Sequence, residues 1–140
     1  MKIRSIVILS LYMFLVNIDI SAQKPIDKNA TKETVDLYNS LLLTIQKKQI
    51  LLGQQDATAY GIDWKTDDDR SDMKTVSGTH PAVYGWDVGD IEKGAEKNLD
   101  GVEFQEIRKL IKQAYQRGGV NTISWHTINP VSNLSAWDDK

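Results

Sequence analysis

The sequence predicts an α/β protein in which short parallel strands alternate with helices. Three short apolar runs are centred near Leu51, Val83 and Ile123, which lie 32 and 40 residues apart. This spacing is typical of β-loop-α units, whose strands pair in parallel. A stripe of apolar residues at helical spacing lies between the second and third runs. Polar side chains follow each run, so we expect them to gather at one edge of the sheet.

The first 22 residues are expected to be an export signal. Lys2 and Arg4 precede an apolar run over 6–16, and cleavage is expected after Ala22. The run is shorter than the roughly 20 apolar residues of a membrane span. We therefore expect residues 23–140 to be exported to the periplasm, the cell surface or the medium, with no membrane segment after cleavage. A signal anchor that is never cleaved is the alternative.

The next segment predicts a helix followed by a strand. Apolar residues recur at helical spacing between Thr31 and Lys48, and Asn29 or Thr31 is available to cap the start. The brief run 50–52, closed by Gly53, predicts the first buried strand. A polar loop should then cover 54–80, with a helical turn around 71–76, and it looks too polar to be part of the core.

The second half of the chain predicts strand, helix and strand. Residues 82–87 form the second strand, which ends in Asp87. Asp100 and Glu103 match a capping box ahead of a core-facing helix that Gly118 and Gly119 end. The third strand is predicted over residues 120–125, where β-branched side chains are frequent.

Composition narrows the function classes. The formal net charge of −2 gives no electrostatic reason for nucleic-acid binding. There are no cysteines, and the two histidines, His80 and His126, are too few for conventional zinc chemistry. The acidic stretch 67–72 lacks the glycine and final glutamate of a calcium loop, so a solvated surface loop is expected there. We therefore expect neither a metal nor a cofactor. Four tryptophans and five tyrosines can serve a core or stack on sugars.

Several segments together resemble glycoside hydrolase family 26. They are Leu52-Gly53-Gln54-Gln55-Asp56-Ala57-Thr58-Ala59-Tyr60-Gly61, Pro81-Ala82-Val83-Tyr84-Gly85-Trp86-Asp87, Ile123-Ser124-Trp125-His126, Asn129-Pro130 and Ser135-Ala136-Trp137-Asp138. The similarity runs from about Thr34 to the last residue, in the family's order and spacing. It implies a (β/α)8 barrel, of which this chain would supply roughly the first three strands, because such a barrel typically needs about 250 residues.

The resemblance also implies an activity. Family members are retaining β-mannanases that cleave β-1,4-mannosidic bonds, so mannan, galactomannan or glucomannan, or their mannooligosaccharides, would be the partner. Retaining hydrolysis uses two carboxyl groups about 5 to 5.5 Å apart. The family places its acid/base and nucleophile glutamates after strands four and seven, so we expect both beyond the end of this chain and no catalytic residue within it. A pair made by Asp56 and Asp87 is not favoured.

Four residues are candidates for substrate contact or support. His126 resembles the family's histidine near the sugar at the cleavage subsite, and Trp137 resembles an aromatic that lines the glycan cleft. Asp87 and Asn129 could orient the site as supporting hydrogen bonders. Structural roles are the alternative for each.

Trp86 and Trp125 are expected to pack in the core or at the barrel rim. Two other interpretations of the chain stay open. It could be a non-catalytic glycan-binding module that uses Trp137 and His126, or an unfolded fragment with exposed strand edges.

Overall fold

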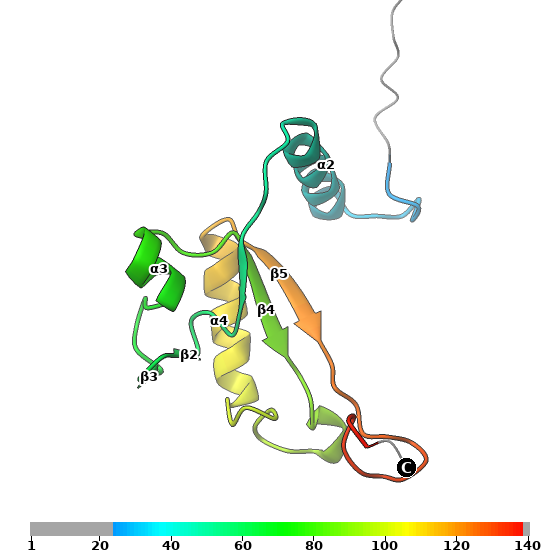
Figure 1. Ribbon diagram of the computed structural model, residues 1–140. Coiled ribbons are helices and arrows are strands. Elements are labelled where there is room, and N and C mark those ends of the chain that lie inside the picture. Colours follow the sequence, from blue (N-terminus) through cyan, green and yellow to red (C-terminus); the bar gives the residue numbers. More distant parts are fainter. Residues whose placement is uncertain (1–23, 139–140) are drawn as a thin grey trace, which may run out of the picture. The chain divides into compact units, whose positions relative to one another are not determined.

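A computed structural model describes residues 24–138 of the chain. The described part of the chain divides into two compact units, with the boundary between Gln49 and Ile50. The expected export signal lies outside the described residues. Between residues 24 and 138, no helix is both long and apolar enough to cross a membrane. The first unit contributes a helix, and the second contributes the sheet and the candidate site (Figure 1).

The first unit contains helix α2, Lys32–Gln46. The hydroxyl of Thr31 accepts a hydrogen bond from the backbone N–H of Thr34 at 3.3 Å, which is the usual N-cap arrangement. Asn29, the other cap candidate, instead donates its backbone N–H to Asp27. The predicted helix is therefore confirmed, and Thr31 is its cap.

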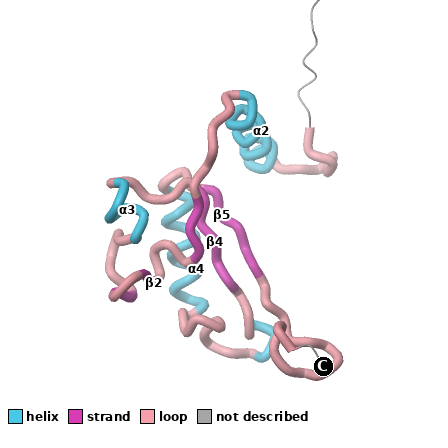
Figure 2. The backbone as a smooth tube through the Cα atoms, in the orientation of Figure 1, coloured by secondary structure: helices cyan, strands magenta, loops and turns pink. Residues whose placement is uncertain are grey.

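The second unit is built on a three-stranded parallel sheet in the order β1-β4-β5 (Figures 1 and 2). The strands are β1, Gly53–Gln55; β4, Val83–Asp87; and β5, Val120–Ser124. Gln55 pairs with Gly85, and Asp87 pairs with Ser124. The three predicted strands thus exist and pair in parallel.

The first strand begins later than its apolar run suggests. It was expected over 50–52, but β1 starts at Gly53. The carbonyl of Leu52 accepts the backbone N–H groups of Ala82 and Val83, so it lies at the point where the chain joins the sheet. Regular pairing starts one residue later, where Gly53 meets Val83. Hydrophobicity located the strand within a few residues, and its hydrogen bonds set the boundary.

Helix α4, Phe104–Gln116, covers one face of β4 and β5 (Figure 1). Side chains alternate between the two faces of a strand, so Tyr84 and Trp86 both point toward this helix and stack with ring centroids 6.0 Å apart. The indole N–H of Trp86 donates to Asn121 at 2.7 Å. The apolar core consists of Ala57, Ala59, Tyr84, Trp86, Val102, Ile107, Leu110 and Ala114.

The capping box expected before α4 is wrong. Glu103 is the N-cap, but its side chain makes no capping hydrogen bond. Asp100 belongs to a preceding turn, in which the side-chain carbonyl of Asn98 accepts the backbone N–H groups of Asp100 and Val102. The turn is organised by the buried Asn98 and not by the acidic pair.

The segment between β1 and β4 is more ordered and more buried than expected. It holds the hairpin of β2, Tyr60–Gly61, and β3, Trp64–Lys65, followed by the short helix α3, Asp72–Ser77. Asp72 accepts from the indole of Trp64 at 2.6 Å and from the backbone of Ile62 at 2.9 Å, which ties hairpin and helix together. Residues 56–59 are buried, so the expectation that 54–80 stays out of the core is wrong for this part.

Asp69, in the acidic stretch, joins three basic side chains from different parts of the second unit. Its carboxylate contacts the ammonium of Lys74, Nε2 of His80 at 2.8 Å and the guanidinium of Arg117 at 3.2 Å. Hydrogen bonds from Lys74 and then His80 hold the pKa of Asp69 far below its ordinary value. This exposed cluster links the α3 region to the end of α4.

Replacing Asp69 with asparagine should lower the melting temperature at pH 7. A lowered folded-state pKa stabilises the fold above the unfolded value near 3.8, and this contribution is lost as the pH falls further. The difference between wild type and D69N should therefore shrink below about pH 4. Circular dichroism melts across pH 2–8 provide the measurement. D68N, at the exposed neighbouring aspartate, is the control, and an equal effect of D68N would contradict the role of the cluster.

Candidate functional site

Polar side chains from two paired strands meet at the carboxyl edge of the sheet. Asp87 is the last residue of β4, and Ser124, its register partner, is the last residue of β5. The Ser124 hydroxyl donates to Oδ2 of Asp87 at 2.9 Å. Two residues further on, Nδ1 of His126 lies 2.5 Å from the same oxygen. The sequence-predicted residues Asp87 and His126 therefore form a directly bonded pair.

The Asp87 carboxylate is buried and fully engaged. Only 3% of the residue is exposed. Burial opposes ionisation, but hydrogen bonds from the Gly89 backbone at 2.7 Å, from Ser124 and from His126 outweigh it and hold the pKa of Asp87 below its ordinary value. Asp87 is therefore a fixed carboxylate that orients His126, and it is poorly suited to donate a proton near neutral pH.

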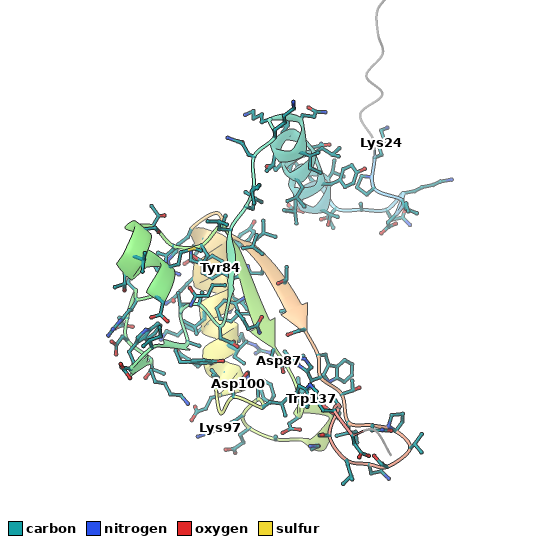
Figure 3. All side chains as sticks on the ribbon, in the orientation of Figure 1. Lys24, Tyr84, Asp87, Lys97, Asp100 and Trp137 are labelled. Carbon is teal, nitrogen blue, oxygen red and sulfur yellow. The ribbon has the colours of Figure 1, made fainter. Side chains whose placement is uncertain are left out.

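Trp137 completes the arrangement from the C-terminal loop. Its ring stacks on the imidazole of His126, with centroids 4.9 Å apart and an angle of 23° between the planes. Trp137 is 68% exposed, so much of its aromatic surface is free. Figure 3 shows Asp87 and Trp137 at the same end of the sheet, with Asp100 nearby.

These residues line an open depression of about 370 Å³. Its lining consists of Gln55, Asp87, Leu99, Asp100, Ser124, His126 and Trp137. An exposed aromatic surface beside hydrogen-bonding groups suits a ligand that has both apolar faces and hydroxyls. Among the described residues, no group of three or more histidine and acidic side chains could hold a metal ion.

Two other sequence-predicted residues lie outside the lining of the depression. Asn129, expected as a supporting hydrogen bonder, does not line it. Its side chain organises the C-terminal loop by donating to the carbonyl of Asp138 at 3.1 Å and accepting from the backbone of Val131. Trp86 is in the core as expected, but Trp125 is 55% exposed. Its indole N–H donates to Glu92, which lies in the short 3-10 helix η1, Ile91–Lys93, after β4. Of the two places expected for Trp125, the core is therefore excluded, and the barrel rim stays a prediction.

Asp56 is a buried carboxylic acid next to the site. It is 0% exposed and adopts a positive φ of 47°, and its Oδ1 has no hydrogen-bond partner within the described chain. Burial raises the pKa of Asp56 to about 6, and the charges of Asp100 and Asp87 add to the increase. Burial and the Asp56 charge likewise raise the pKa of Tyr60 to about 12. The sequence placed Asp56 at the end of a strand, but its burial depends on tertiary packing.

Polar and aromatic side chains that gather at the carboxyl ends of parallel strands are the arrangement found in (β/α)8 barrels. The model of glycosyl hydrolase family 26 matches residues 26–139. The chain belongs to this family.

Similar proteins have been described in several bacteria. The chain is 35% identical over 108 residues to a mannan endo-1,4-beta-mannosidase from Bifidobacterium adolescentis, covering 74% of this chain and 10% of that protein. Among solved structures, a GH26 β-mannanase from Bacteroides ovatus is 45% identical with a TM-score of 0.74, over 78% of this chain and 31% of that one. A modular endo-β-1,4-mannanase from Cellulomonas fimi is 34% identical with a TM-score of 0.55, over 72% and 24%.

These matches settle the fold class. The structural relatives are (β/α)8 barrels, and the parallel sheet with its covering helix corresponds to part of such a barrel. The chain spans about a third or less of the length of each of these relatives.

Replacing Asp87 with asparagine should destabilise the fold at pH 7. Asparagine keeps the size but loses charge-assisted hydrogen bonds, so a loss of about 1–3 kcal/mol is expected by urea denaturation. Because the folded-state pKa of Asp87 is lowered, this contribution exists above about pH 4 and fades in acid. D90N is the control, since the ion pair of Asp90 is with the half-exposed Lys93. A D87N protein as stable as D90N would contradict the structural role.

Replacing Asp56 with asparagine should have the opposite effect above pH 6. A folded-state pKa near 6, raised from 3.8, means that wild-type stability falls as the pH rises from about 4 to about 6. D56N removes this ionisation, so it should melt at a higher temperature than wild type above pH 6, and the difference should disappear below pH 4. Thermal melts over pH 3–8 test this, and a pH-independent difference would contradict it.

Proposed function

We propose that this chain supplies a sugar-binding part of an exported enzyme that hydrolyses β-1,4-mannosidic bonds in mannan, galactomannan or glucomannan. The observation that carries the proposal is the arrangement at the carboxyl edge of the sheet, in which Asp87 is hydrogen-bonded to His126 and Trp137 stacks on His126. Membership of family 26 and the similarity of this chain to mannanases support the same substrate class.

Each side chain has a defined part in the proposed binding. The free surface of Trp137 would stack on the apolar face of a mannose ring. His126 has one ring nitrogen bonded to Asp87, which leaves the other available for a sugar hydroxyl. Asp87 would fix the direction of that second nitrogen, because the carboxylate itself is held by Gly89 and Ser124. Sugar binding then depends on groups whose positions are set before the ligand arrives.

The hydrolytic step would need two carboxyl groups with different protonation states. No glutamate lines the depression, and Asp87 is committed to its three hydrogen bonds. The family resemblance implies that both catalytic glutamates follow later strands of the barrel. We accordingly propose binding and positioning of substrate for this part of the molecule, with the retaining chemistry assigned to residues of those later strands.

Truncating Trp137 should weaken the binding of mannotetraose by about 10-fold, which corresponds to roughly 1.4 kcal/mol. W125A is the matched control, because Trp125 is also exposed but does not line the depression. Isothermal titration calorimetry measures affinity, with cellotetraose as the comparison sugar, and reducing-sugar release from galactomannan measures turnover.

The outcomes separate the functions. Mannotetraose binding that W137A weakens and W125A leaves unchanged supports the proposal. Binding without turnover, even when the later strands are present, would leave a glycan-binding module. Absence of mannotetraose binding, or a preference for cellotetraose, would overturn the assignment of substrate.

A further inference from the structure

The amide of Gln55 fills a space that the strand beside it leaves vacant. Gln55 and Gly85 are register partners on β1 and β4. A Cβ atom at position 85 would collide with Oε1 of Gln55 and lie 3.0 Å from its Cδ. The Gln55 side chain therefore lies across β4, on the sheet face opposite the Tyr84 and Trp86 rings, because side chains alternate between the two faces.

The carboxyl group of Asp56 fixes the orientation of the Gln55 amide by a hydrogen bond. Nε2 of Gln55 donates to Oδ2 of Asp56 at 3.3 Å. Asp56 is itself fixed, since its backbone N–H donates to the Gly85 carbonyl at 2.9 Å and its own carbonyl accepts from Ala59 at 2.8 Å. A buried and backbone-anchored carboxyl group is a rigid partner, so the orientation of the Gln55 amide is limited.

The amide keeps unused hydrogen-bonding capacity toward the depression. A glutamine side chain offers two N–H donors and an oxygen with two lone pairs. Within the described residues, its contact with Asp56 is the one hydrogen bond that the Gln55 side chain makes. Gln55 is exposed and lines the same depression as His126 and Trp137. One N–H and the carbonyl oxygen are thus available to a ligand there.

The sheet register places Gln55 two residues along the strands before the Asp87–Ser124 pair, on the same face of the sheet. Gln55 and Gly85 share one level, and Asp87 with Ser124 occupies the next level toward the carboxyl edge on the same face. A ligand stacked on Trp137 and bonded to His126 would therefore have the Gln55 amide on the side facing the sheet. A neutral group that both donates and accepts suits a sugar hydroxyl, which does the same.

We propose that Gln55 is a further substrate-binding residue that hydrogen-bonds a sugar hydroxyl, and that Gly85 and Asp56 are its positioning residues. This inference rests on the proposed function of the depression. The raised pKa of Asp56 agrees with it, because a buried carboxyl group that lacks a partner for Oδ1 reduces stability near neutral pH and so needs a reason other than folding.

The test is a double-mutant cycle on mannotetraose affinity in the full chain. Q55A should weaken binding by about 10-fold, the effect of one lost hydrogen bond to a ligand. G85A should weaken it similarly, because the new methyl group displaces the flexible end of Gln55 and not the backbone. In the Q55A background, G85A should cause no further loss, since the group that it displaces is already gone.

Q54A is the matched control. Gln54 is the same residue type one position earlier, but its side-chain oxygen accepts from the backbone of Met73 at 3.3 Å and it does not line the depression. Q54A should change the melting temperature and leave affinity unchanged, whereas Q55A should do the reverse. For Asp56, D56A should lower affinity and D56N should restore most of it, because asparagine retains an oxygen that can accept from Gln55.

The result that overturns the inference is distinct from failure of the proposed function. If wild type binds mannotetraose and W137A weakens binding, but Q55A does not, Gln55 is not a binding residue and the function stands. Additive losses in G85A and Q55A would show that Gly85 acts independently of Gln55 and would reject the positioning role. If wild type does not bind the sugar at all, the proposed function fails and this inference fails with it.

Discussion

The hydrogen bonds around the Asp87 carboxylate are the interaction on which the site depends. One buried side chain joins the end of β4 to Ser124 at the end of β5 and to the backbone of Gly89 in the following loop. A buried carboxylate is costly unless its oxygens are paired, so these contacts are required by burial as much as by function. His126 and the Trp137 ring stacked on it take their positions from this anchor.

Strand β4 serves the core and the site through the alternation of its side chains. Tyr84 and Trp86 face α4 and form the centre of the core. Gly85 and Asp87 face the other way, where one leaves room for the Gln55 amide and the other bonds His126. The packing that fixes the first pair therefore also fixes the second, because both belong to the same five-residue strand. Stability and binding geometry are coupled at the level of the backbone.

Much of this could be predicted from the sequence because it depends on local pattern. The parallel α/β order, the helix before β5 and the gathering of Asp87 and His126 at one edge of the sheet follow from strand spacing and from where polar residues end each strand. The hydrogen bond between the two side chains was not predicted. The start of β1 and the burial of Asp56 could not be predicted, since each depends on residues far away in the sequence. The missing side-chain cap of α4 has a local cause, because Asn98 organises the turn that precedes the helix. Trp125 illustrates the same limit, because its exposure is decided by which elements pack beside β5.

Asp56 shows how stability and function can be told apart in this fold. Apolar residues of similar size at a fully buried position would remove the cost of a carboxyl group whose Oδ1 is without a partner in the described chain. The positive φ of residue 56 does not by itself require aspartate, since asparagine also adopts this conformation readily. Unlike an apolar residue, aspartate offers the Gln55 amide an acceptor, which asparagine would share, and it places a negative charge beside the Asp87 and Asp100 carboxylates. A group that opposes folding while orienting an exposed neighbour is best understood as part of the proposed binding site.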